Sequence, residues 1–153
     1  MTVPDIRIQQ AVSGDIAELV SLENVSFVSS DGLLNRRTFG YHIKRGNLLL
    51  TARNTKTGEL AGYILVFLRE KSARAYSLST ATRFRNQGIA RTLFENAISE
   101  CKDRGIRTIR LEVRKENIGA QKLYQSMGFK LSKALPDYYG EGQDGIRMEL
   151  IRK

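Results

Sequence analysis

Residues 78–94 read LSTATRFRNQGIARTLF, and this stretch decides the fold. It joins the end of a predicted strand, Ala75–Thr80, to a helix whose apolar residues recur at the spacing of one helical face. Gly88 and the small Ala90 lie at the junction, where the first backbone N–H groups of a helix have no intrahelical partner and sit at the positive end of its dipole. The stretch therefore predicts a strand–loop–helix unit that can bind phosphate.

Other phosphate-binding motifs do not fit this loop. Residues 85–90, RNQGIA, lack the Gly-Lys-Ser/Thr of a nucleotide P-loop and the three glycines of a dinucleotide fingerprint, so ATP and NAD are not expected. The residues alone leave an alternative open, a tight turn flanked by the solvated side chains of Arg83, Arg85 and Arg91. Cations beside the loop also suit a polyanionic ligand.

The rest of the chain alternates strand and helix patterns. The predicted strands are Asp5–Val12, Asn47–Arg53, Leu60–Leu68, Ala75–Thr80, Thr108–Val113, Phe129–Leu135 and Ile146–Ile151. The predicted helices follow a cap at Ser13, cover Asn35–Lys44, run from Ile89 to a stop at Gly105, and cover Ile118–Met127. This order predicts an α/β (α+β) fold, one domain over residues 1–153 with helices packed on a mixed sheet.

Length and composition fit such a domain. The 153 residues are 41% hydrophobic and 27% charged, and no apolar run approaches the roughly 20 residues that a membrane-spanning helix needs. The N-terminus shows no basic cluster before an apolar run, so we expect no secretory signal and no membrane partner. One cysteine and one histidine favour a reducing, cytoplasmic location and no metal site.

The charge balance points to an anionic partner. Twenty-five Lys and Arg residues against 16 Asp and Glu residues give a formal charge of +9. Nucleic acid, an acidic protein and a phosphorylated cofactor all fit this excess. Direct nucleic-acid binding is not expected, because the basic residues are spread along the whole chain and no aromatic-interleaved basic motif occurs.

A second motif, LEVRKENIGAQKLYQSMGF at residues 111–129, follows about twenty residues after the loop. Together the two motifs resemble the GNAT N-acetyltransferases, and the second resembles the ribosomal-protein-alanine N-acetyltransferases within that family. The resemblance runs from about Ala73 to the C-terminus and includes, further on, Tyr138, Tyr139, Gly142, Asp144 and Met148. Ala90 replaces the commoner second glycine of the loop, and Ala81-Thr82 replaces an acidic residue and a proline.

The resemblance implies a GNAT-like domain with a mixed, mostly antiparallel sheet of about seven strands and about four helices. It implies acetyl-coenzyme A as acetyl donor, Glu112 as proton acceptor and Tyr124 as proton donor. Residues 86–91 match the pyrophosphate loop, residues 78–80 the strand that pairs with the pantetheine arm, and Asn117 a coenzyme contact. The candidate cofactor-binding residues are Leu78, Ser79, Thr80, Arg85, Asn86, Gln87, Gly88, Ile89, Ala90, Arg91 and Asn117.

The chemistry of acetyl transfer to an amine agrees with these roles. At pH 7 an α-amine of pKa near 8 is roughly 10% neutral, whereas a lysine is neutral less than about 0.1% of the time. An ordinary glutamate is a weak base, so Glu112 suits a relay from an α-amine, directly or through water, better than deprotonation of a lysine. A tyrosine such as Tyr124 keeps its proton at neutral pH and can give it to a thiolate.

Each candidate also has a purely structural interpretation. Glu112 fits the exposed half of an alternating strand, Tyr124 fits a core aromatic, and Asn117 fits a helix N-cap, which does not exclude a coenzyme contact. His42 is interpreted as a structural or surface residue, and Cys101 as a small core residue.

Two further residues have two interpretations each, because Tyr138 and Tyr139 fit either the cap of the last hairpin or the acceptor mouth.

The leading hypothesis is an N-acetyltransferase acting on a protein or peptide α-amine, with a ribosomal protein as one candidate acceptor. The alternative enzyme is an acetyltransferase for a small-molecule amine or a lysine. The alternative from another class of protein is a nucleic-acid-binding module.

Overall fold

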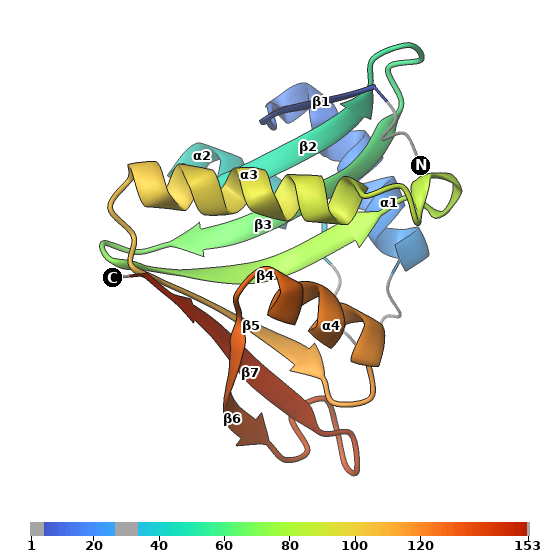
Figure 1. The fold of residues 1–153 in the computed structure, drawn as a ribbon. Helices are drawn as coiled ribbons and strands as arrows, with labels where there is room; N and C mark the ends of the chain where they lie inside the picture. Colours follow the sequence, from blue (N-terminus) through green and yellow to red (C-terminus); the bar gives the residue numbers. More distant parts are fainter. Residues whose placement is uncertain (1–4, 27–33, 153) are drawn as a thin grey trace.

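The computed structural model describes residues 5–26 and 34–152. The helical elements are α1 (Ile16–Ser26), α2 (Arg36–Arg45), α3 (Ile89–Asp103) and α4 (Ile118–Ser126), with short 3₁₀ turns at Ser13–Asp15 and Thr82–Phe84. The strands are β1 (Ile6–Gln10), β2 (Leu48–Asn54), β3 (Leu60–Leu68), β4 (Ser72–Thr80), β5 (Thr108–Arg114), β6 (Lys130–Leu135) and β7 (Gly145–Ile151). Figure 1 shows them as one curved sheet with helices on both sides.

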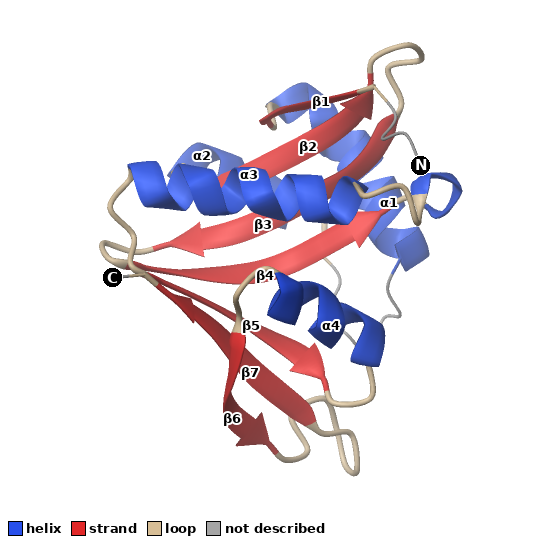
Figure 2. Cartoon of the chain, in the orientation of Figure 1, coloured by secondary structure: helices blue, strands red, loops and turns tan. Residues whose placement is uncertain are grey.

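The seven strands have the order β1-β2-β3-β4-β5-β7-β6. Neighbours pair antiparallel, except that β4 and β5 pair parallel. That parallel pairing is short, covering residues 72–74 of β4 and 108–110 of β5. Beyond it the two strands separate, as Figure 2 shows, and one backbone edge of β4 faces the gap. The predicted mixed, mostly antiparallel sheet is confirmed.

Helices cover the sheet from both faces. The alternating apolar residues of α3 pack against one face, together with the inward residues of β2, β3, β5 and β7. Helices α1 and α2 pack on the other face of the β1–β4 part, around Phe39 and Tyr63, whose rings meet edge to face at 5.6 Å. Figure 1 shows α3 in front of the sheet and α1 and α2 behind it. The core layer under α3 therefore includes strands from both sides of the gap, and the second layer covers the β1–β4 part.

Local boundaries follow the sequence closely, with one correction. Asn35 caps α2 as expected, its side chain accepting a hydrogen bond from Thr38 N at 2.9 Å. Ser13 is not a helix cap, because it is the first residue of a 3₁₀ turn. There Asp15 Oδ2 accepts from Val12 N at 2.8 Å, so the side-chain bond at this turn reaches back to the residue before it and caps none of the N–H groups that follow. Strand β4 also begins three residues earlier than the predicted Ala75.

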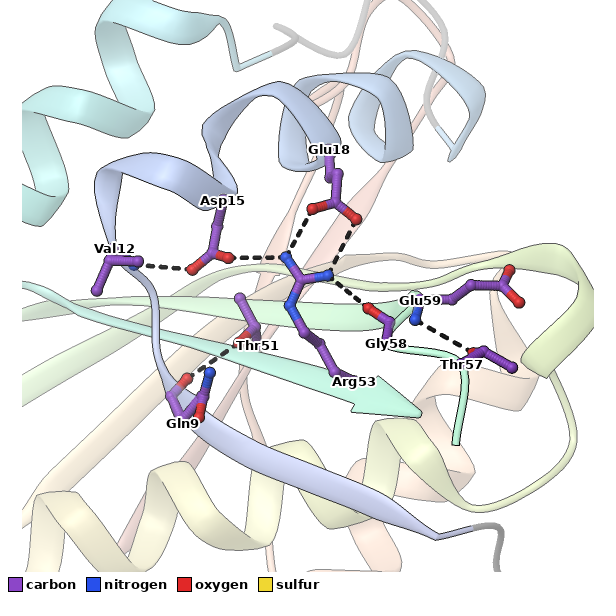
Figure 3. A network of polar contacts seen from close by, with 9 residues as sticks. All are labelled: Gln9, Val12, Asp15, Glu18, Thr51, Arg53, Thr57, Gly58 and Glu59. Atoms are coloured by element: carbon purple, nitrogen blue, oxygen red, sulfur yellow. Dashed lines mark hydrogen bonds and ion pairs between the residues drawn. The ribbon is translucent and has the colours of Figure 1, made fainter. Parts of the chain in front are cut away.

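An ion-pair network anchors α1 to the β2–β3 hairpin (Figure 3). The Arg53 guanidinium binds Asp15 Oδ1 at 2.7 Å and Glu18 at 2.8 and 3.0 Å, and it also donates to the carbonyl of Gly58 at 2.8 Å. The hydrogen bond to Glu18 raises the pKa of Arg53 above its ordinary value, against the opposing effect of burial. The first turn of α1 is therefore held in place by charge as well as by packing.

The two residues interpreted as structural lie in the interior. Cys101 on α3 is buried in the core, and burial raises the pKa of its thiol to about 11. His42 on α2 is buried, with Nδ1 3.0 Å from the Asn47 amide nitrogen and its ring stacked on Phe67 at 4.8 Å. Burial lowers the pKa of His42. Both structural interpretations are confirmed.

In the described part of the chain, no helix is both long and apolar enough to cross a membrane.

Candidate active site

The gap between β4 and β5 opens into two clefts that share Leu78. One cleft, of about 520 Å³, lies at the N-terminus of α3, and we call it the loop cleft. The other, of about 590 Å³, lies between β4, β5, α4 and the β6–β7 loop, and we call it the reaction cleft. Because Leu78 lines both clefts, they form the two ends of one path along the free edge of β4.

The loop cleft is built mainly from backbone. Asn86 and Gly88 both have positive φ angles, 62° and 81°. Within the helix Thr92 N is the first donor and bonds to Gly88 O at 3.0 Å, so the amides of residues 89–91 have no acceptor inside the helix. Successive N–H groups in such a turn form a concave nest for an anion, and the helix dipole reinforces it. The geometry of the loop therefore suits a pyrophosphate.

Most of the predicted cofactor residues meet at this cleft. Gln87 is the exception within the loop, because its side-chain amide turns back to the Arg83 carbonyl at 3.3 Å. Ile89 is buried, so only its backbone is available to a ligand. The predicted residues that line the loop cleft are Leu78, Ser79, Thr80, Arg85, Asn86, Gly88, Ile89, Ala90 and Arg91.

Arg91 links the loop to α4. Its guanidinium donates to the Ser126 hydroxyl, which in turn donates to the carbonyl of Leu123 at 2.6 Å. Leu123 itself lines the loop cleft. Arg91 lines the loop cleft, and its cationic head is held between α3 and the end of α4.

Glu112 lies in the reaction cleft between two arginines. Its Oε1 accepts from Arg74 Nε at 2.6 Å and its Oε2 from Arg147 Nε at 2.9 Å. The Glu112 side chain is only 5% exposed, so these charge-assisted bonds lie in a poorly solvated place. Glu112 is not a freely solvated strand residue. Each carboxylate oxygen keeps a second lone pair for a further donor.

Tyr124 reaches the same cleft from α4. Its ring packs edge to face on Phe94 at 5.6 Å and lies 6.2 Å from the ring of Phe129. Burial raises the pKa of Tyr124 to about 12. Tyr124 lines the cleft, and no described residue forms a hydrogen bond with its hydroxyl. The ring therefore serves the core, and the hydroxyl is a protonated donor available to a ligand.

Asn117 has the N-cap role that its position allowed. Its Oδ1 accepts from Ala120 N at 3.1 Å and fixes the start of α4. Asn117, Ala120 and Tyr124 lie on one helical face, and all three line the reaction cleft. Asn117 thus lies at the reaction end of the path rather than at the loop end.

A buried polar chain forms the opposite wall of the reaction cleft. Glu23 on α1 accepts a short hydrogen bond from the Tyr63 hydroxyl, which lies 2.8 Å from Ser77 Oγ on β4. The other Glu23 oxygen accepts from Leu34 N at 3.0 Å. Burial raises the pKa of the Tyr63 hydroxyl above that of an ordinary tyrosine. This wall fixes α1 against β4 beside the cleft.

Tyr138 and Tyr139 lie in the turn of the last hairpin and also line the reaction cleft. Both line the reaction cleft from the β6–β7 loop, and their rings meet edge to face at 4.9 Å. Arg74 Nη2 donates to the Tyr138 hydroxyl at 3.1 Å, and the Arg114 guanidinium lies 4.5 Å from the centre of the Tyr139 ring. Burial raises the pKa of Tyr139 to about 12. The pair lies at the mouth of the cleft.

Sequence reasoning missed Arg74, Arg147 and Glu23 at this cleft. Arg147 lies directly opposite Glu112 in the β5–β7 register, but α4 and β6 separate the two strands along the chain. No local spacing therefore links the two residues. The usable signals were the alternation of charged and apolar residues in β5 and β7, and a carboxylate on the apolar side of α1.

Comparison with known proteins agrees with this architecture. The [ribosomal protein bS18]-alanine N-acetyltransferase of Salmonella typhimurium is 30% identical over 109 residues, which are 69% of this chain and 74% of that protein. The matches to relatives from Bacillus subtilis and Escherichia coli cover 62% and 64% of those proteins' lengths. The crystal structure of the Escherichia coli ribosomal-protein-S18-alanine N-acetyltransferase has a TM-score of 0.84 and 25% identity, with 97% of this chain and 95% of that chain covered.

The family model covers the loop cleft and all of the reaction cleft except its β6–β7 loop. The model of the acetyltransferase (GNAT) family matches residues 16–129. That range includes the loop at the N-terminus of α3, the separated strands β4 and β5, and all of α4. The predicted resemblance is confirmed, and the chain belongs to the GNAT acetyltransferase family.

Proposed function

We propose that this protein is an acetyl-coenzyme A-dependent N-acetyltransferase that acts on the α-amine of a protein or peptide. The observation that carries the proposal is the single path between β4 and β5. At one end it has a backbone cradle for pyrophosphate, and at the other it has Glu112 and Tyr124. The names of the relatives make a ribosomal protein a candidate acceptor. One buried free cysteine suits a cytoplasmic enzyme.

The chain's own residues fit the coenzyme along this path. The nest at residues 86–90 and the Arg91 guanidinium would hold the pyrophosphate, because both present N–H donors to one point. The edge of β4 at residues 78–80 would pair with the pantetheine arm, since β5 has left that edge open. When bound, acetyl-coenzyme A supplies the acetyl group as a thioester.

Tyr124 is the proposed proton donor. Because its pKa is raised to about 12 by burial, the hydroxyl stays protonated throughout the neutral range. An acid of this strength can protonate a thiolate only when the two are in contact, and Tyr124 lines the cleft where that contact would occur. Its packing on Phe94 fixes the direction of the hydroxyl.

Glu112 is the proposed proton acceptor. Arg74 and Arg147 each hold one of its oxygens, and each oxygen keeps a lone pair for the amine or for a water. A carboxylate is a weak base, and it suits an amine that is already partly neutral. An α-amine meets that condition about a hundredfold better than a lysine at pH 7. We therefore favour an α-amine acceptor, with Glu112 receiving its proton directly or through one water.

A matched pair of peptides tests this proposal. One copy has a free N-terminus and blocked lysines, and the other has a capped N-terminus and free lysines. Each is incubated with the protein and acetyl-coenzyme A, and mass spectrometry locates the acetyl group. We expect acetylation of the first copy alone. Acetyl on the lysines of the capped copy alone would overturn the α-amine assignment, and acetyl on neither would favour a small-molecule amine.

A further inference from the structure

One face of the C-terminal part of the sheet carries an excess of positive charge. In β5 and β7, residues 109, 111, 113, 146, 148 and 150 turn toward the core under α3 and α4. The residues between them turn to the opposite face. The register places Arg110 opposite Glu149, Glu112 opposite Arg147, and Lys133 of β6 opposite Arg147. The basic side chains of this face are Arg74, Arg110, Arg114, Lys130, Lys133 and Arg147, and we call it the basic face.

The charge that a ligand would meet on this face is carried by Arg110, Lys130 and Lys133. Among the described residues, the face has two carboxylates, those of Glu112 and Glu149, and Arg114 has partners of its own. Glu112 is already held by Arg74 and Arg147. Arg110, Lys130 and Lys133 are exposed, so no described helix covers them. Figure 1 shows α1 and α2 behind the β1–β4 part of the sheet and α4 on the other side of β5. The surface is therefore accessible and attracts anions.

The basic face begins at the reaction cleft. Arg74, Glu112 and Arg114 line that cleft and also belong to the face. From Arg147 the cations continue to Lys133 on the edge strand. Adjacent strands lie about 4.8 Å apart, so the step from β5 across β7 to β6 spans about 10 Å. An extended polypeptide covers that distance in about three residues.

We propose that the basic face binds an acidic segment of the acceptor polypeptide, at about positions 3–6 after the acetylated N-terminal residue. The inference rests on the proposed function, because the α-amine fixes where the segment starts. Carboxylates of Asp or Glu would pair with Arg110, Lys133 and Lys130 as the chain leaves the cleft. A polynucleotide fits less well, because Glu149 lies among the cations and no aromatic residue occurs in β5, β6 or β7 for a base to stack on.

Binding of two labelled peptides tests the inference. They share their first two residues and differ at positions 3–6, which are four aspartates in one and four asparagines in the other. Fluorescence anisotropy with the coenzyme A-loaded protein should show the acidic peptide binding at least tenfold more tightly at low salt, with a preference that falls as salt rises. Equal affinities would overturn the inference, and so would tighter binding of a short RNA oligonucleotide of equal charge.

Charge reversals locate the contact. Lys133→Glu changes an exposed side chain of the basic face and should lower the affinity for the acidic peptide about threefold or more. Lys56→Glu is the matched control, because it makes the same charge change at the exposed tip of the β2–β3 hairpin. It should leave the preference within about 1.5-fold of the parent. Equal losses from both variants would show only an effect of net charge and would overturn the assignment to this face.

Acetyl transfer to the same peptides separates the two proposals. If both are acetylated at equal rates and bind equally, the acidic-segment inference fails and the proposed function stands. If the acidic peptide binds in a Lys133-dependent way but neither peptide is acetylated, the proposed function fails and the basic face remains a site for acidic peptides.

Discussion

The two ends of the path between β4 and β5 are built in opposite ways. The loop cleft uses backbone N–H groups and small residues from one continuous stretch, residues 78–91. The reaction cleft uses side chains from α1, β4, β5, α4 and the β6–β7 loop. The first end depends on backbone shape and the second on individual polar atoms. The two ends should therefore fail in different ways when single residues are changed.

Removal of one oxygen at the reaction cleft should have the largest effect. Tyr124→Phe deletes the hydroxyl but keeps the ring that packs on Phe94. We expect kcat to fall about 10²- to 10⁴-fold while coenzyme affinity in calorimetry stays unchanged. Tyr41→Phe, at an exposed tyrosine on α2, is the control and should keep full activity. A loss for Tyr124→Phe within about threefold would assign this residue to packing alone.

A change of backbone shape should act on the loop cleft instead. Gly88→Glu places a side chain at φ 81° and a negative charge beside the proposed pyrophosphate site. Strain and repulsion together should weaken coenzyme binding about 10²-fold or more in calorimetry. Gly58→Glu makes the same change at φ 76° in the β2–β3 turn, where an added Cβ meets nothing within 4 Å. The comparison loses its basis if both variants bind coenzyme as tightly as the parent.

Glu112→Gln should produce a smaller loss of turnover, together with a loss of stability. The amide keeps the shape but leaves the Arg74 and Arg147 guanidiniums without a counter-charge, which should lower the free energy of unfolding by roughly 1–3 kcal/mol. We expect kcat to fall about 10- to 100-fold. Glu149→Gln, on the same face of β7, is the control for charge. Unchanged kcat with reduced denaturant stability would make Glu112 a structural anchor only.

The pH dependence should separate the acceptor amine from Tyr124. An α-amine of pKa near 8 gains about tenfold in its neutral fraction between pH 7 and pH 9, so kcat/KM should rise by about that factor. Burial raises the pKa of Tyr124 to about 12, so its donor form persists as pH rises and is lost only near that value. Activity should therefore reach a plateau and hold it up to about pH 10. A decline centred near pH 9 would show that another group donates the proton.

The same contrast explains how much the sequence could predict. Helix and strand order, the Asn35 cap and the loop at the start of α3 depend on neighbouring residues, and they were predictable from spacing and residue type. Ten of the residues that line the loop cleft come from one segment, residues 78–91, and nine of these ten were predicted for that reason.

The partners of Glu112 depend on strand order instead. Arg74 and Arg147 lie 38 and 35 residues away along the chain and reach Glu112 only because β4, β5 and β7 are neighbours in the sheet. Glu23 is brought to the cleft by the packing of α1 on Tyr63, which no local pattern specifies. The expected helix cap at Ser13 was wrong because a 3₁₀ turn precedes α1 there. Such turns are frequent at the start of an α-helix, and the local sequence does not separate the two.

The burial of Cys101 gives the protein a silent thiol. It is the chain's only cysteine, and a pKa raised to about 11 by burial keeps it protonated at neutral pH. Chromogenic reagents that react with thiolates will not react with the folded protein. The coenzyme A that turnover releases can therefore be measured without a signal from the enzyme's own thiol. Denaturant exposes the same sulfur. One chromogenic reagent can thus serve as both a turnover counter and a clock for the opening of the core.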